Sequence, residues 1–378
     1  MSDVRSTRTA HSPQKSLSTT SPVSLKRTDA VGLNRRQVLL FGAAAAGLGA
    51  ATSLGAATGL VRSASAEPDL RFIDVHHHFT PPGRRGAYVS PIKPWSPQGS
   101  LEEMDRNGVA TAIGYLGFID VGDLNENRRM ARSWNEFGAG LHRQWPQRFG
   151  LFAALPMMDV DGSLQEMAYA LDVLKADGLG LATSYGNLWL GDASFDPIWQ
   201  EANRRKAVVY VHPKDASCCG VDQLSYMNST VTGPWLEWPV NTARTILSLM
   251  LSGTLRKYRD IRFIFSHGGG VMPMVVDRIG DAASWPTVGP EKFGELFPEG
   301  MHAEFARLYI ECALAYSEVN FGALTKITPS TQILFGTDYD RISIGYSTER
   351  FHRLTMDPKT EARIARGNAE VLFPRLKG

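Results

Sequence analysis

Short apolar runs alternate with amphipathic segments along most of the chain. The eight apolar runs cover residues 72–76, 110–116, 149–155, 178–182, 207–212, 262–266, 308–313 and 332–336. Strands that are buried on both faces of a parallel sheet have continuous hydrophobic runs of this kind. Segments with helical spacing lie between them, among them residues 163–176, 196–206 and 242–258. Because strand and helix alternate eight times, the pattern predicts an α/β fold, a closed (β/α)8 TIM barrel.

Local signals add helix starts and long loops to this pattern. Ser100 and Asp196 each have a side-chain oxygen that is suited to the free amides at the start of a helix. A Pro-rich loop at residues 81–97 follows the first strand, and a second long loop at 215–237 follows the fifth. Since loops after the strand ends form the active face of such barrels, we expect the first of these loops to shape the pocket.

The N-terminal region has a different composition. Residues 1–33 are rich in Ser, Thr, Arg and Pro, Arg35-Arg36 precede an Ala/Gly/Leu stretch, and Ala64-Ser65-Ala66 is a small-residue cleavage pattern. These features resemble a twin-arginine export signal. We therefore predict an export signal and leader at 1–66, one barrel domain at 67–378, and a periplasmic or extracellular location. A membrane anchor formed by the uncleaved signal and a cytoplasmic location are the alternatives.

Composition excludes some classes of partner. Hydrophobic residues make up 43% of the chain, which is enough for a sizeable core, and the formal net charge is only +2. A nearly neutral chain gives no electrostatic reason to expect nucleic acid as a partner. No segment after the leader is long and apolar enough to span a bilayer, so we predict no stable membrane span after cleavage.

Polar residues gather at the carboxyl ends of the predicted strands. The first strand ends with His76 and His78, which share one face because side chains alternate along a strand. Later strands end with His212, His267 and Asp338. In a parallel barrel all these ends meet at one mouth, so the five side chains should lie close together.

These residue types predict a metal site. A single histidine at a strand end is usually a hydrogen-bonded structural residue, and we expect His77, which faces the other way, to be packed or exposed. Five polar groups at equivalent strand ends are harder to explain in that way, because buried polar groups without partners are costly. Imidazole and carboxylate are ligands of zinc-type ions, and a catalytic site leaves one position open. We predict one divalent metal ion, with zinc favoured and manganese as the alternative.

Three motifs are similar to those of a known family. They are His76-x-His78, the sequence Ser-His-Gly-Gly-Gly at 266–270, and Gly-Thr-Asp at 336–338. From Phe72 to the C-terminus the chain resembles the amidohydrolase superfamily of metal-dependent hydrolase-type barrels. Within it, the chain resembles the non-oxidative decarboxylases of aminocarboxymuconate semialdehyde and of hydroxybenzoates. Segments 94–97, 152–156 and 203–209 are most similar to 6-methylsalicylate decarboxylase-like members.

The resemblance implies a role for each site residue. It implies one metal ion bound by four ligands, His76, His78, His212 and Asp338. It implies His267 as an acid/base residue beside the metal. It also implies that Arg278, eleven residues further along, reaches the substrate carboxylate of a neighbouring subunit, which suggests a homodimer.

The expected activity is that of a carboxy-lyase acting on a small hydroxylated aromatic acid, of the 2-hydroxybenzoate or 6-methylsalicylate type. Asp338 would protonate the ring carbon, and His267 would orient or reload it. No organic cofactor is expected, because no Gly-x-Gly-x-x-Gly sequence follows a strand. The main alternative is a lactonase or amidase of the same superfamily, since metal-bound water also serves hydrolysis. A catalytically inactive barrel that acts as an exported binding protein is the third hypothesis.

Two differences from the superfamily affect the site. The fourth strand ends at 181–185 without the lysine or glutamate that bridges two metals, which favours a single ion. Asp340 stands where relatives have proline or a small residue, which would alter the pocket rim. The candidate aromatic residues for stacking on a substrate ring are Trp189, Tyr185, Phe118 and Tyr339.

Overall fold

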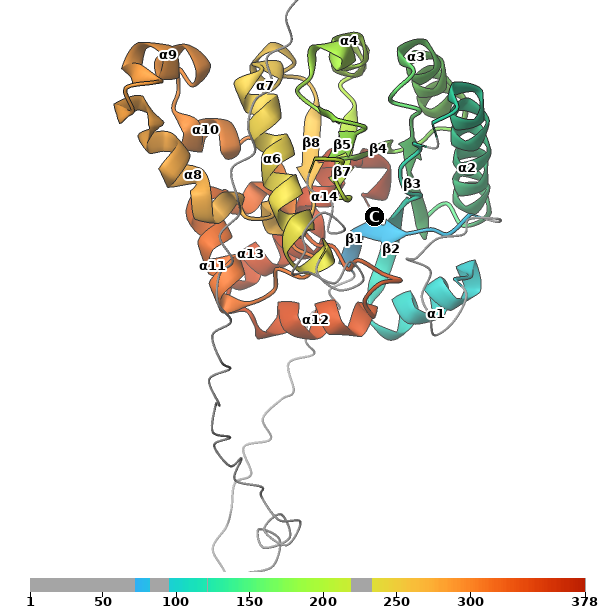
Figure 1. Ribbon diagram of the computed structural model, residues 1–378. Coiled ribbons are helices and arrows are strands. Elements are labelled where there is room, and N and C mark those ends of the chain that lie inside the picture. The colour runs from blue at the N-terminus through green and yellow to red at the C-terminus, as the bar shows by residue number, and fades with distance from the viewer. Residues whose placement is uncertain (1–71, 82–94, 121, 219–232, 378) are drawn as a thin grey trace, which may run out of the picture. The chain divides into compact units, whose positions relative to one another are not determined.

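The computed structural model describes residues 72–81, 95–120, 122–218 and 233–377. Its main feature is an eight-stranded parallel sheet in the order β1-β2-β3-β4-β7-β8-β9-β10 (Figure 1). These strands are Phe72–His78, Val109–Tyr115, Phe149–Ala154, Gly178–Ala182, Val208–His212, Arg262–Phe265, Tyr309–Glu311 and Ile333–Leu334. Each lies within about two residues of a predicted apolar run, and the TIM-barrel prediction is confirmed.

Hydrogen bonds between the first and last strands close the sheet into a barrel. Val75 N donates to Phe335 O at 3.1 Å, and Asp338 N donates to His76 O at 2.8 Å. The segment that follows β10 therefore runs beside β1. Since this segment carries Asp338, closure of the barrel itself brings the C-terminal carboxylate to the histidines of the first strand.

Helices surround the strands, as Figure 1 shows for α2, α3, α4, α6 and α8. In chain order the helices are α1 (Pro97–Arg106), α2 (Leu124–Gln144), α3 (Val160–Ala168), α4 (Asp196–Arg204), α6 (Trp238–Leu251), α7 (Thr254–Lys257), α8 (Met272–Gly280), α9 (Gly289–Leu296), α10 (Met301–Phe305), α11 (Glu318–Ile327), α12 (Ile344–Arg353), α13 (Pro358–Ala362) and α14 (Asn368–Leu372). A two-stranded antiparallel hairpin, β5 (Ser184–Tyr185) with β6 (Leu188–Trp189), follows β4 and was not predicted.

The helix start predicted at Asp196 is confirmed, the one predicted at Ser100 was wrong, and neither side chain is the N-cap of its helix. Helix α1 begins at Pro97 with Ser96 as its N-cap, whose hydroxyl accepts from Gly99 N at 3.1 Å. Ser100 lies inside this helix, where it is buried. Asp196 is the first residue of α4, and it is Asp192 that accepts from Ser194 N one short turn earlier. Ser96 thus takes the capping role expected of Ser100. Helix α4 instead continues from a short 3-10 turn that Asp192 caps, and its own N-cap residue, Phe195, makes no side-chain hydrogen bond.

The core has two layers, as the alternation of side chains along the strands requires. Inside the barrel, Ile73 and Val75 pack in a buried cluster with Tyr210 and Phe152, whose rings stack at 5.1 Å. Between the barrel and the helices lies a larger cluster, in which Trp199 of α4 is fully buried. The polar residues at the strand ends lie directly above this inner layer.

None of the helices within the described residues is long and apolar enough to cross a membrane. The predicted leader at 1–66 lies outside the described residues, as do most of the first long loop and the middle of the second. Export and the position of the domain boundary therefore stay predictions.

Candidate metal centre

An irregularity in β1 turns the histidines towards the barrel mouth. Ile73 and Val75 face the barrel interior, so strict alternation would send His76 outwards. The pairing with β2 shifts in register between Asp74 and His77, and after this shift His76 and His78 face the mouth. Bulges next to active sites commonly re-aim side chains in this way. The shared face of the two histidines was predicted, whereas the bulge that places them there was not.

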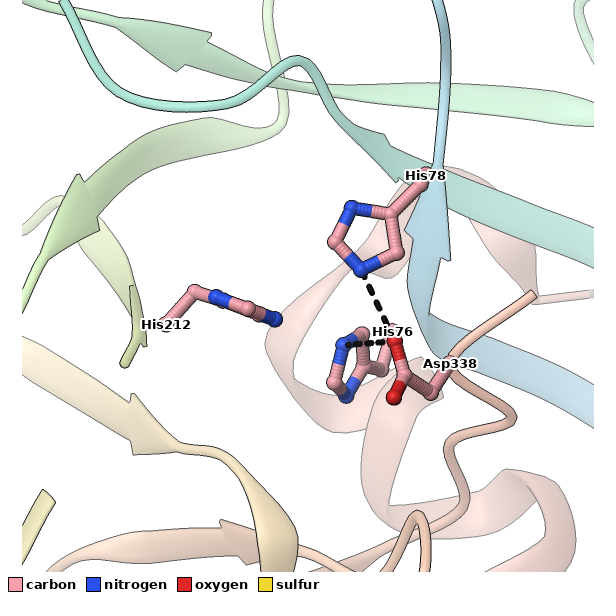
Figure 2. Close-up of side chains that lie close together, drawn as sticks. All are labelled: His76, His78, His212 and Asp338. Carbon is pink, nitrogen blue, oxygen red and sulfur yellow. Dashed lines mark hydrogen bonds and ion pairs between the residues drawn. The ribbon is translucent and has the colours of Figure 1, made fainter. Parts of the chain in front are cut away.

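Four of the predicted residues meet at the mouth. Donor atoms of His76, His78, His212 and Asp338 all lie within 4.8 Å of one another, and all four residues are buried. Figure 2 shows the side chains of His76 and His78 from β1, of His212 from β7, and of Asp338 from the segment after β10 close together. Asp338 Oδ1 lies 2.8 Å from His78 Nε2 and 3.2 Å from His76 Nε2.

Hydrogen bonds on the far side of two rings set their orientation. His212 Nδ1 lies 2.7 Å from Pro213 O, and His76 Nδ1 lies 2.7 Å from Glu311 Oε1. A carbonyl or carboxylate oxygen only accepts, so each Nδ1 carries a proton, and Nε2 is the atom through which each ring would bind a cation. Partners of this kind fix the tautomer of histidines that bind metals.

Glu311, at the end of β9, is the residue that sequence reasoning missed. Its fully buried carboxylate accepts from His76 Nδ1, from His267 N at 2.7 Å and from Ala313 N at 2.6 Å. Gly336 makes room for it, because a Cβ at that position would lie 2.2 Å from Glu311 Oε2. The available signal was a glutamate within an apolar run, since glutamate is almost never fully buried unless it is paired.

His267 lies beside the four residues. Its ring centroid is 4.9 Å from that of His76 and 5.7 Å from that of His212. Its Nδ1 is 3.1 Å from Ala313 O, so Nδ1 donates and Nε2 is the nitrogen that can exchange a proton. His267 also forms a second possible donor group with His76 and Glu311. Because Glu311 already accepts three hydrogen bonds, we interpret it as a positioning residue.

His77 turns away from the mouth as predicted, and of the two expected alternatives, packed or exposed, the structure shows that it is packed. It is fully buried, with Nδ1 3.0 Å from Asp74 Oδ2 and Nε2 2.9 Å from Ser100 Oγ. Asp74 also accepts from Thr337 Oγ1 at 2.6 Å. This network ties the outer face of β1 to α1 and to the Gly-Thr-Asp segment.

The titration of the site is dominated by burial and by two carboxylates. Burial opposes a charge on His76, but Glu311 and Asp338 outweigh it and raise the pKa of His76 to about 10. Burial lowers the pKa of His78 to about 3, and burial also holds the pKa of His212 well below its usual value. Burial opposes ionisation of Asp338, yet the neighbouring His76 holds the pKa of Asp338 well below its usual range. One proton on His76 thus balances an ionised Asp338.

The donor set fits a divalent cation. His76 Nε2 is buried and makes no hydrogen bond within the described residues, although it is only 3.2 Å from a carboxylate oxygen. Two of the three imidazoles are neutral, and the third, His76, is protonated only because two carboxylates lie next to it. A divalent cation would displace that single proton when it binds. Three imidazoles and a carboxylate suit zinc or manganese.

A cavity of about 210 Å³ opens beside His78, His212 and Asp338. This volume is below the usual range for ligand pockets, about 300–1,000 Å³, and therefore suits a molecule with a single ring. The remaining lining residues are Tyr115, Gly117, Phe118, Pro213, Lys214, Asp215, Trp238 and Arg341. Tyr115 also stacks on His212 with centroids 5.2 Å apart. The site thus joins a polar inner wall to an outer wall that combines three aromatic side chains with three charged ones.

Of the four aromatic residues predicted to stack on a substrate, only Phe118 lines this cavity. Tyr185 is buried, and its hydroxyl accepts from Ala182 N at 3.0 Å. Tyr339 lies against His77 with centroids 4.8 Å apart, and half-buried Trp189 belongs to β6. Tyr115 and Trp238 were not considered from the sequence, because their place depends on how neighbouring strands and loops pack.

Arg278 does not reach the cavity of its own chain. It lies exposed in the last turn of α8, with its guanidinium carbon 5.8 Å from the centre of the Trp285 ring. A role across a dimer interface stays a prediction. Asp340 does not line the cavity, but its Oδ1 lies 3.4 Å from Nη1 of Arg341, which does.

The comparisons with known proteins agree with the resemblance found in the motifs. The family model for amidohydrolases matches residues 73–375. The decarboxylase macB of Penicillium terrestre is 32% identical over 327 residues, which cover 81% of this chain and 95% of that protein. The 6-methylsalicylic acid decarboxylase of Penicillium expansum is 32% identical over 323 residues, covering 81% and 97%. These relatives are carboxy-lyases, and the carboxy-lyase class predicted from the sequence is confirmed.

A solved structure has the same fold. The dihydroxybenzoic acid decarboxylase of Polaromonas, crystallised with manganese and the inhibitor 2-nitroresorcinol, superposes with a TM-score of 0.70 at 22% identity. The match covers 82% of this chain and 98% of that one. At this level of identity the likeness supports the barrel fold.

Proposed function

The chain belongs to the amidohydrolase family, and from this premise we propose that it is a metal-dependent, non-oxidative decarboxylase of a small hydroxylated aromatic acid. The substrate would be of the 2-hydroxybenzoate or 6-methylsalicylate type. The convergence of His76, His78, His212 and Asp338 beside a small aromatic-walled cavity carries this proposal. The activities named for the relatives at 32% identity support it.

The reaction exchanges a carboxylate for a proton. Direct loss of CO2 would leave an unfavourable carbanion on the ring, so protonation of the carbon that bears the carboxylate has to come first. The C–C bond to the carboxylate then breaks, its electron pair restores the ring, and CO2 leaves. A hydroxyl ortho to this carbon helps, because its oxygen shares the positive character of the protonated ring. A bound divalent ion would act as a Lewis acid that orients the ring and acidifies this hydroxyl.

The protein residues divide the proton transfer between them. Asp338 is adjacent to the cavity and would pass the proton to the ring carbon. Since the pKa of Asp338 is held well below its usual range, its resting form is the carboxylate. A proton donor is therefore needed beside it, and His267 Nε2, on a ring fixed through Nδ1, would supply that proton. Tyr115, Phe118 and Trp238 would position the ring and exclude water.

For the metal we propose one ion in the donor set of His76, His78, His212 and Asp338. Imidazole-rich ligation favours zinc, whereas the decarboxylase of Polaromonas contains manganese. Metal analysis of the purified protein, followed by reconstitution of the stripped protein with each ion, separates the two.

Gas release tests the proposed reaction. The reconstituted protein is incubated with 2-hydroxybenzoate, 6-methylsalicylate and 2,6-dihydroxybenzoate, and with benzoate and 3-hydroxybenzoate as matched acids that lack the ortho hydroxyl. We expect CO2 and the corresponding phenol from at least one ortho-hydroxy acid, and neither product from the two controls. Unchanged acids, together with cleavage of lactones or amides, would instead identify a hydrolase, which is the main alternative.

A further inference from the structure

The cavity contains two cations that differ in how they are paired. Lys214 Nζ donates to Asp120 Oδ2 at 3.1 Å, so its charge has a hydrogen-bonded partner. Arg341 has Asp340 as its neighbouring carboxylate, but Nη1 and Oδ1 are 3.4 Å apart. Within the described residues Arg341 Nη1 and both oxygens of Asp340 are buried without a hydrogen bond. Arg341 is therefore the cation with capacity left for a ligand.

Arg341 is also held close to the proposed metal centre. Its backbone N donates to Asp338 O at 2.9 Å, three residues after that carboxylate in the chain. Both Arg341 and Asp338 line the same cavity. A ligand that contacts the metal site therefore lies in a cavity that Arg341 also lines.

The cavity walls indicate which anion would fit. Phe118, Tyr115 and Trp238 provide apolar surfaces for a flat ring, and the volume of about 210 Å³ leaves room for few further groups. Guanidinium recognises planar, two-oxygen anions such as carboxylate particularly well. An aromatic monocarboxylate matches the two requirements together.

We propose that Arg341 binds the carboxylate of the aromatic acid and thereby selects acids over the corresponding phenols. The proposal rests on the proposed function for the identity of the ligand. Decarboxylation turns the anionic group into neutral CO2, so Arg341 loses its partner when the product forms. Arg341 consequently favours the bound substrate over the phenol, and its removal should act on KM more than on kcat.

The test compares an acid with its own phenol. Binding of 2-hydroxybenzoate and of phenol to the metal-loaded protein is measured by calorimetry for wild type, Arg341→Gln, Arg341→Lys and Lys214→Met. Arg353→Gln is the matched control, because the side chain of Arg353, at the end of α12, is 73% accessible and lies outside the cavity lining. We expect Arg341→Gln to weaken 2-hydroxybenzoate binding about ten- to hundredfold, and phenol binding less than twofold, with unchanged metal content. Arg341→Lys should lie between wild type and Arg341→Gln, and Arg353→Gln should match wild type.

Several outcomes would overturn the proposal. Equal weakening of acid and phenol would mean that Arg341 only maintains the shape of the cavity. An unchanged acid affinity, or a selective loss in Lys214→Met instead, would assign the carboxylate elsewhere. The decarboxylase proposal fails in a different way, which is that wild type releases no CO2 from any hydroxybenzoate. In that case the binding comparison still shows whether Arg341 selects acids over phenols.

Discussion

The inner and outer walls of the site are built in different ways. The inner wall consists of His76, His78, His212 and Asp338 at strand ends, all at most 6% exposed and backed by buried Glu311. The outer wall comes from residues after the strands, such as Phe118 and Arg341, whose side chain is 21% exposed. Barrel topology dictates the first wall, and loop sequence dictates the second. We therefore expect the inner wall to determine the chemistry and the outer wall to determine which acid is accepted.

Removing the inner carboxylate should have the largest effect. Asp338→Asn keeps the shape but removes both a metal ligand and the proposed proton donor. We expect loss of bound metal and a fall in kcat of about a thousandfold or more, since acid–base roles alone contribute about 10²–10⁴. Metal analysis and CO2 release measure these. Asp277→Asn, at an exposed position of α8, is the control, and retained metal with near-normal turnover in Asp338→Asn would contradict the assignment.

The fold and the inner wall could largely be predicted from the sequence, because both follow from periodicity. Apolar runs located the eight strands, and parallel strands in a barrel must end at one mouth, so His212 and Asp338 could be placed together. The irregularity between Asp74 and His77 could not be predicted, since it depends on pairing with a neighbouring strand. Glu311 left one signal that was missed, a glutamate within an apolar run, but its contact with His76 depends on the packing of distant strands. Arg341 was not recognised either, because a loop arginine has no periodic signal.

A variant at His267 distinguishes the role of this residue in proton transfer from a role in metal binding. In His267→Asn we expect kcat to fall about hundredfold or more while metal content stays at the wild-type level, because the residue lies beside the four donors. Turnover assays and metal analysis of the same preparation provide the comparison. Loss of the ion in this variant would show instead that His267 is a fifth ligand.

A variant at Glu311 tests whether this carboxylate positions His76 for metal binding. Glu311→Gln retains the size of the side chain but weakens its hold on His76, and such partners are worth about 10–100-fold in metal affinity or activity. Chelator competition measures the affinity. Glu304→Gln is a matched control, because Glu304, on α10, is also a buried glutamate and pairs with Arg259. Equal metal affinities in the two variants would rule out the positioning role.

The smallest expected effect is a pH dependence of metal affinity. The pKa of His76 is raised to about 10, so at pH 7 the metal-free protein carries a proton there that the ion must displace. Affinity should then rise by about tenfold for each pH unit between pH 7 and 9. Glu311→Gln should make the slope shallower, because one of the carboxylates that raise the pKa loses its charge. Titrations with a metal indicator at several pH values measure it, and a flat profile in wild type would refute the linkage.

Anomalous diffraction from crystals of the metal-loaded protein tests the proposed centre most directly. We expect one peak bonded to His76, His78, His212 and Asp338, next to the cavity that Arg341 lines. An ion bound by other residues, or the three imidazoles turned away from one another around an empty mouth in an active enzyme, would contradict it.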